Sequence, residues 1–131
     1  MTVDTEDGRG SRSSRPLTTL EHQVISAILC ADCPGVLELR AQLSTARVRG
    51  NWTPKGSPSI DLEVSSVAPA APLSGPTLPV DVHVYDDQGR FLGELIVWLS
   101  NGKLSALEYA WVTDSAPLSL PNVEMLRVLP R

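Results

Sequence analysis

The segment "LGELIVWLSNGKLSALEYAWV", residues 92–112, decides the expected fold. Two apolar stretches flank Asn101-Gly102, a dipeptide that favours a two-residue type I′ hairpin because both residues tolerate positive φ. Such a turn places Ser100 opposite Lys103 and, counting back, Leu95 opposite Glu108. In this register one face carries Phe91, Leu95, Val97, Leu99, Leu104, Ala106 and Ala110. The other face carries Leu92, Ile96, Trp98, Leu107, Tyr109 and Trp111, with Glu94 among them.

Two further stretches predict strands, and two predict helices. "SIDLEVS" (59–65) and "VDVHVY" (80–85) alternate apolar and polar residues, as half-buried strands do. "LTTLEHQVISAILC" (17–30) has apolar residues at helical spacing, with Thr18 and Glu21 as a capping box. "VLELRAQL" (36–43) predicts a shorter helix. The expected fold is α+β: two N-terminal helices packed on a four-stranded, mainly antiparallel sheet whose last three strands form a meander.

Length and composition predict one domain. The chain has 131 residues, 42% of them hydrophobic and 20% charged, which suits a single globular unit. Residues 1–16 are polar and rich in Gly, Ser and charge, so we expect a disordered N-terminal tail before a domain spanning 17–131. The formal net charge of -4, with scattered basic residues, argues against binding nucleic acid. No signal peptide or membrane-spanning run is visible, so we expect a cytoplasmic protein with no membrane partner.

Cys30 and Cys33 form a Cys-x-x-Cys motif, which has three possible interpretations. A thioredoxin-type pair lies at a helix N-terminus directly after a strand, whereas here a helix precedes the motif. A structural zinc needs four ligands, and only His22 and His83 could complete a set. The favoured interpretation is a pair of free cysteines that act as small apolar residues at the helix junction. We therefore expect no metal and no cofactor.

Both faces of the predicted hairpin are apolar, and one helical layer covers only one face. The C-terminal segment (116–130), the proline-rich loop (68–79) or another protein could shield the second face. Exposed aromatic residues beside a few acidic ones are typical of protein-binding surfaces. The predicted partner-binding residues are therefore Trp98, Tyr109, Trp111 and Glu94. Strands 59–65 or 80–85, if at a sheet edge, would offer a route to a homodimer.

The stretches "PGVLELRAQL" (34–43) and 92–112, with a proline before "NVEML", carry a family resemblance. They resemble a family of small, uncharacterised actinobacterial proteins with a Leu-Arg-x-Gln-Leu segment and an Asp/Asn-Gly turn before Leu-Glu-Tyr. The resemblance covers roughly residues 17–126. Some proteins of this type resemble immunity proteins of polymorphic toxin systems, so the resemblance implies inhibition of a toxin and no catalytic residues.

Two functions follow from these observations. The leading expectation is a non-enzymatic protein-binding module, with immunity-type inhibition of a toxin as one version. The alternative is a small-molecule-binding or enzymatic domain of the cone-like type, with a cavity lined by Trp98, Tyr109 and Trp111. An enzyme is the less favoured of the two, because the chain has neither a G-x-S-x-G nucleophile elbow nor a phosphate-binding loop.

Overall fold

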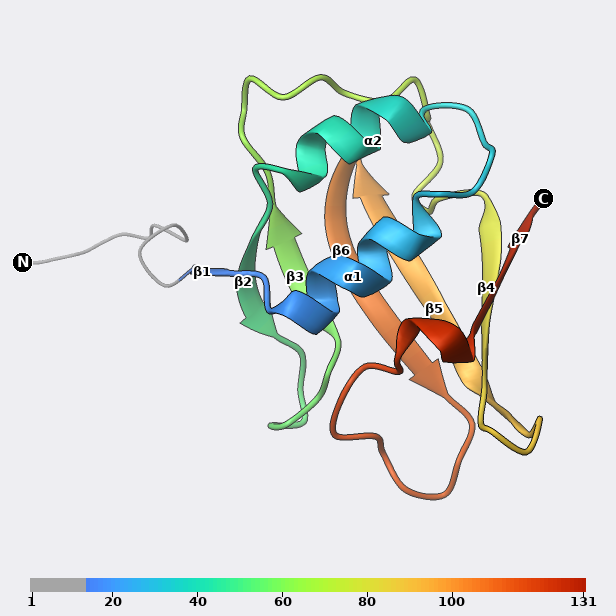
Figure 1. Cartoon of the computed structure of the whole chain (residues 1–131). Helices are drawn as coiled ribbons and strands as arrows, with labels where there is room; N and C mark the ends of the chain where they lie inside the picture. The colour runs from blue at the N-terminus through green and yellow to red at the C-terminus, as the bar shows by residue number, and fades with distance from the viewer. Residues whose placement is uncertain (1–13) are drawn as a thin grey trace, which may run out of the picture.

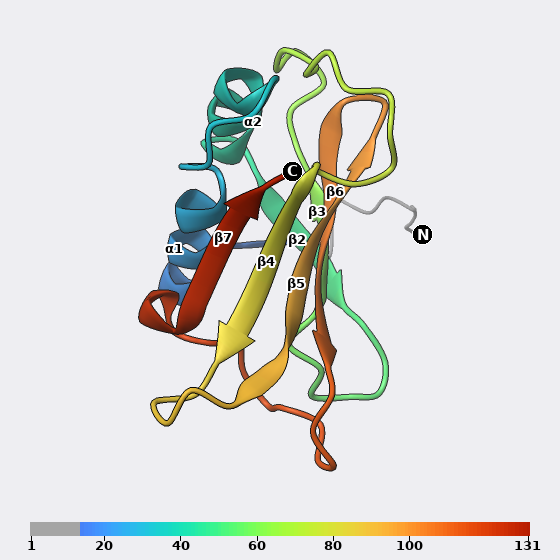
Figure 2. The ribbon, with the colours of Figure 1, turned by 90° about the vertical axis from the view of Figure 1, so that its right-hand side faces the viewer.

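The computed structural model describes residues 14–131, which form a sheet layer and a helical layer. The sheet has seven strands in the order β1-β2-β3-β6-β5-β4-β7, and every neighbouring pair is antiparallel. Both α-helices lie on one face of it (Figures 1 and 2). The elements are β1 Arg15–Pro16, α1 Thr19–Ile28, α2 Val36–Leu43, β2 Arg47–Asn51, β3 Ile60–Glu63, β4 Val80–Tyr85, β5 Phe91–Ser100, β6 Lys103–Trp111, η2 Val123–Met125 and β7 Leu126–Pro130.

The predicted fold class, α+β, is right, but the expected count of four strands is wrong. The meander of β4, β5 and β6 is present, and β1, β2 and β7 enlarge the sheet around it. β2 buries only Val48 fully, and β7 ends in a proline, so neither shows the alternation that marks a half-buried strand. β3 and β4 lie inside the sheet, so the predicted homodimer route through either strand is also wrong.

The two helices begin and end near the predicted positions. The Thr18 side chain accepts a hydrogen bond from the Glu21 backbone N–H, and the Glu21 carboxylate accepts one from the Thr18 N–H, which confirms the capping box. Gly35, with φ of 84°, precedes α2. The Arg40 Nε donates to the Leu29 carbonyl at 2.8 Å, and this bond ties α2 to the C-terminal end of α1.

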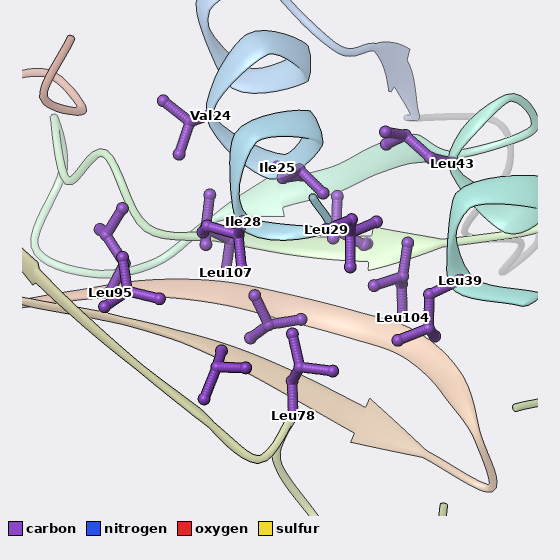
Figure 3. Packing of buried hydrophobic residues seen from close by; sticks show 14 of the residues in the cluster. Val24, Ile25, Ile28, Leu29, Leu39, Leu43, Leu78, Leu95, Leu104 and Leu107 are labelled. Atoms are coloured by element: carbon purple, nitrogen blue, oxygen red, sulfur yellow. The ribbon is translucent and has the colours of Figure 1, made fainter. Parts of the chain in front are cut away.

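The core lies between the helices and the sheet (Figure 3). Val24, Ile25 and Ile28 on α1 and Leu39 on α2 face Leu107 and its neighbours on the sheet, and all five are at most 1% exposed. Burying side chains of this size gives about 1.5–3 kcal/mol each. The helical layer therefore stabilises the fold through one face of the sheet only.

The β5–β6 register differs from the predicted one by a single residue. Ser100 lies opposite Lys103, as predicted, but a bulge follows and Trp98 lies opposite Ala106. Beyond the bulge Leu95 lies opposite Tyr109 and not opposite Glu108. A shift of one residue moves the β6 side chains from Ala106 onward to the other face, because side chains alternate along a strand. The predicted face is therefore right for Leu104, which lies opposite Leu99, and wrong for the β6 residues beyond the bulge.

Gln42 on α2 supports the bulged end of this hairpin. Its side chain is fully buried, and its Oε1 accepts the Leu104 backbone N–H at 2.9 Å. Its Nε2 donates to the carbonyls of Gly102, at 2.9 Å, and Pro69, at 2.7 Å. The bulge leaves the Leu104 N–H in need of an acceptor, and a residue 62 positions away supplies it.

Two residues that precede position 17 belong to the sheet. Arg15 and Pro16 pair with Val48 and Arg47 at the edge of the sheet, so the last two residues of the predicted tail belong to the fold. Arg15 also forms an ion pair with Glu21 at 2.9 Å. The remainder of the predicted tail, residues 1–13, lies outside the described residues.

Candidate interaction face of the sheet

The sheet face turned away from the helices is defined here as the open face. Figure 2 shows both helices on the other side of the sheet. Strand pairing and ring contacts place these residues on the open face: Asp61, Asp81, His83, Tyr85, Phe91, Glu94, Ile96, Trp98, Ala106, Glu108, Ala110, Arg127 and Leu129. Phe91 is 42% exposed and Leu129 is 52% exposed. Large apolar side chains are therefore open to solvent on this face.

Neither of the two intramolecular candidates for covering this face does so. The proline-rich loop runs beside the end of β5, where Leu78 N–H bonds to the Val97 carbonyl and Leu99 N–H to the Pro76 carbonyl. The C-terminal segment buries Leu120 in the core and then extends the sheet as β7 beside β4. Within residues 14–131, both segments lie at the edges of the sheet or on its helical side.

Three aromatic rings gather at one end of the open face, where β4 and β5 meet. The centroid of the His83 ring is 5.5 Å from that of Phe91 and 6.5 Å from that of Tyr85. Tyr85 and Phe91 lie 5.6 Å apart, and the Arg127 guanidinium lies 5.9 Å from the Tyr85 ring centroid. These separations are typical of aromatic pairs in contact. We call His83, Tyr85 and Phe91 the aromatic cluster.

Two indole rings donate to carboxylates nearer the middle of the sheet. Trp98 Nε1 donates to Glu108 Oε1 at 3.0 Å, and Trp52 Nε1 donates to Asp61 Oδ1 at 2.9 Å. Asp61 and Trp98 flank Ala106 in one row across three strands, and Glu108 lies two residues beyond Ala106 on β6. We call these two contacts the tryptophan–carboxylate pairs.

The open face carries acidic groups that have no cationic partner. Among the described residues, Asp61, Glu94 and Glu108 form no ion pair. Asp81 does pair, with Arg131 at 3.0 Å. Arg127, directly opposite His83, brings a positive charge to the aromatic end of the face. The middle of the face is therefore acidic and aromatic, and its charge is not neutralised within the described chain.

The structure divides the four predicted binding residues between the two sides of the sheet. Trp98 and Glu94 lie on the open face. Tyr109 lies opposite Leu95 on the helical side, is 5% exposed, and has its pKa raised by burial. Trp111, two residues further along β6, also belongs to that side and packs against the core. The expected cavity lined by Trp98, Tyr109 and Trp111 is therefore not formed.

Trp111 is the last residue of β6 and lies on the helical side of the sheet beside two loops. A small hollow of about 40 Å³ lies between its ring and the loop residues Pro54, Pro58, Pro117 and Leu118. The Trp111 ring therefore lines this hollow together with prolines from two chain segments, and it packs against the core. Trp111 is thus a structural residue in this fold.

A larger hollow of about 400 Å³ lies beside the first turn of α1. Glu21 is the carboxylate in its lining, together with Lys55 and the Asn51 amide. Burial acts to raise the Glu21 pKa, but hydrogen bonds from Arg15 and Thr18 and the Arg15 charge outweigh burial, so the net shift is downward. A carboxylate held in this way is a poor general acid or base at neutral pH.

The cysteines lie at the junction of the helices, as predicted, and both are free thiols. Cys30 is exposed and Cys33 is partly buried. Burial, reinforced by the Asp32 charge, raises the pKa of the Cys33 thiol, and the Arg40 charge opposes the shift only in part. A raised pKa lowers the thiolate population that a redox nucleophile needs. The described residues contain no group of three or more metal-ligating side chains.

No family model, curated protein or solved structure matches the chain. The resemblance to actinobacterial immunity-like proteins therefore stays a prediction. The structure does give its motif residues a physical role: within Leu-Arg-x-Gln-Leu, Arg40 caps α1 and Gln42 supports the hairpin. Among residues 14–131, no helix is long and apolar enough to span a membrane.

Sequence reasoning missed much of the open face. Trp52 follows β2 in a stretch that resembles a turn-rich connector, so its proximity to Asp61 depends on a strand that was not predicted. The alternation in residues 80–85 predicts that His83 and Tyr85 lie on the polar side of their strand, and this side is the open face. Arg127 belongs to β7. The usable signal was the alternation in 80–85, which puts an imidazole and a phenol on one uncovered side.

Proposed function

We propose that this protein is a non-enzymatic binding domain and that the open face of the sheet binds another protein. The single observation that carries the proposal is the uncovered face itself. It combines aromatic rings, exposed apolar side chains such as Phe91, and carboxylates that form no ion pair within residues 14–131. Aromatic residues of this kind dominate binding energy at protein interfaces, since they bury much area with little loss of rotamer freedom.

The chemistry of the face indicates the kind of partner. Because Asp61, Glu94 and Glu108 form no ion pair with any described residue, a partner with a basic surface would gain from electrostatic complementarity and fast association. Nucleic acid would be repelled by the same charges. One concrete version is inhibition of a toxin enzyme whose active site is basic, since an acidic domain that covers such a site would block its substrate.

The test compares three immobilised baits in a lysate of the source organism. The baits are the wild-type chain, the open-face variant Phe91→Ser, and the control variant Leu37→Ser, whose leucine is 71% exposed on α2. We expect a specific protein on the wild-type and Leu37→Ser baits that is lost or strongly reduced on Phe91→Ser. Removing a hot-spot aromatic costs at least about 2 kcal/mol, or roughly thirtyfold in affinity.

Two outcomes would contradict the proposal. One is the same set of captured proteins on all three baits, and the other is no protein that distinguishes wild type from an empty support. If the captured protein is an enzyme, loss of its activity on addition of the wild-type chain, but not of Phe91→Ser, would support the inhibitory version. Unchanged activity would leave binding intact and remove the inhibitory version.

A further inference from the structure

Resting on the proposed function, we infer that the tryptophan–carboxylate pairs receive an arginine side chain of the partner. The site consists of Trp98 and Glu108 on one side of Ala106 and Trp52 and Asp61 on the other. Its ligand class is a guanidinium carried by a basic protein segment that crosses the middle of the open face. This contact is separate from the aromatic cluster, which lies at the far end of the face.

The first step of the argument is the unused bonding capacity of the two carboxylates. Each accepts one indole N–H, through Glu108 Oε1 and Asp61 Oδ1. Among the described residues, the second oxygen of each carboxylate, Glu108 Oε2 and Asp61 Oδ2, accepts no hydrogen bond and meets no cation. A carboxylate has two oxygens and about four acceptor sites, so each group can bind a further donor without giving up its indole.

The second step is the spacing of these groups across the strands. Asp61 lies directly opposite Ala106, and Glu108 is two residues further along β6. Diagonal neighbours of this kind have Cα atoms about 7–8 Å apart. The side chain that neighbours both carboxylates is the small Ala106, which is 4% exposed, so an incoming group would lie over the larger side chains that cover it. A single planar donor group could therefore address both carboxylates.

The third step is the choice of arginine over lysine. The indole N–H groups are engaged in the plane of each ring, and cations are attracted to the ring faces, most strongly to those of Trp. A guanidinium can stack on an indole and at the same time donate in a fork to carboxylate oxygens, whereas an ammonium acts as a compact, strongly hydrated point charge. Indole and carboxylate together therefore favour arginine over lysine.

The experiment measures binding of fluorescent hexa-arginine and hexa-lysine peptides by anisotropy at physiological ionic strength. Three full-length proteins are compared: wild type, the open-face double variant Asp61→Asn with Glu108→Gln, and the control double variant Glu38→Gln with Glu124→Gln. Both double variants remove two negative charges, but Glu38 is on α2 and Glu124 is in η2. The Asn and Gln amides keep an oxygen that can accept the indole N–H, so the sheet should stay folded, which a melting curve checks.

We expect wild type to bind hexa-arginine at least about fivefold more tightly than hexa-lysine. The open-face double variant should bind hexa-arginine about tenfold more weakly or worse, the loss of about one charge-assisted contact. The control double variant should stay within about twofold of wild type, because charges at a distance are screened by salt.

Three results would overturn the inference: equal affinity for the two peptides, equal weakening by both double variants, or no binding of either peptide to wild type. The first two would mean a general attraction of polycations to an acidic protein. The capture experiment with Phe91→Ser is independent of these peptides. If capture depends on the open face and the peptides show no preference for arginine, only the arginine inference fails. If capture does not depend on the open face, the proposed function fails, whatever the peptides show.

Discussion

Replacing Gln42 with Leu should destabilise the fold more than any surface change, although the two side chains are close in size. Gln42 is fully buried and joins three separate parts of the chain: α2, the proline-rich loop and the β5–β6 turn. Leu would fill most of the same volume, so the cavity term is small. What the variant removes is three hydrogen bonds, and their partners remain buried or partly buried.

The expected loss can be worked from those three partners. The Leu104 N–H would have no acceptor at a buried position, which costs about 1–3 kcal/mol. The Gly102 carbonyl would keep its bond from the Ala71 N–H, and the Pro69 carbonyl is only partly buried, so each of these losses is nearer 1 kcal/mol. The total is about 3–5 kcal/mol, a large part of the 5–15 kcal/mol that stabilises a typical domain.

Urea denaturation followed by tryptophan fluorescence measures this loss. With a slope of about 1–3 kcal/mol/M for a small domain, the midpoint for Gln42→Leu should fall by roughly 1–5 M. The matched control is Gln23→Leu, which changes an exposed glutamine on α1 and should alter the free energy of unfolding by less than about 0.5 kcal/mol. A loss below about 1 kcal/mol for Gln42→Leu, or equal losses for both variants, would refute this account of the hairpin support.

Two further predictions concern the ion pair and the tryptophans. The Glu21 pKa is lowered in the folded state, so its contribution to stability is present above the unfolded pKa of about 4.3 and is lost as pH falls through the lower folded value. Glu21→Gln should therefore lower the free energy of unfolding by about 1–2 kcal/mol at pH 7 and by almost nothing near pH 2. The value at pH 7 is small because Arg15 is 38% exposed and solvent screens its ion pair with Glu21. A difference in urea midpoint that does not change with pH would contradict this. Trp111→Ala should lower the free energy of unfolding by about 2–4 kcal/mol, because Trp111 packs against the core. Trp98→Ala should lower it by less than half as much, and should also weaken capture of the partner, because Trp98 lies on the open face. Urea curves that rank the two variants the other way would show that Trp98 belongs to the core.

Local rules predicted the central elements well. The capping box at Thr18, the alternation in residues 80–85 and the Asn101-Gly102 turn each depend on neighbours a few residues away, and the structure contains all three. Asn101 has φ of 53° and Gly102 has φ of 76°, as a type I′ turn requires. Short-range signals of this kind are readable without knowing the tertiary structure.

The bulge next to that turn could not be predicted from the sequence, and it determines which β6 side chains face the helices. The Leu104 N–H next to the bulge donates to Gln42 Oε1, from a residue 62 positions away. A glutamine in an amphipathic helix ordinarily predicts a solvent-facing position, because glutamine is seldom fully buried. The outer strands β2 and β7 could not be predicted for a similar reason: they pair with their neighbours β3 and β4, and their own alternation is weak. What could not be predicted was in each case a contact between distant segments.

The division of side chains between the two faces of the sheet also separates stability from binding. Leu95, Leu107 and Tyr109 lie on the helical side and are at most 5% exposed, so their free energy of burial is already gained on folding. Ile96, Trp98 and Glu108, on the same two strands, face the other way and remain partly exposed. Their exposed apolar area is still available for burial against a partner. Because side chains alternate along a strand, a substitution at an even-numbered position between Glu94 and Trp98 should change binding, while its odd-numbered neighbour changes stability. Paired substitutions at Ile96 and Val97 would show whether the two properties are separable.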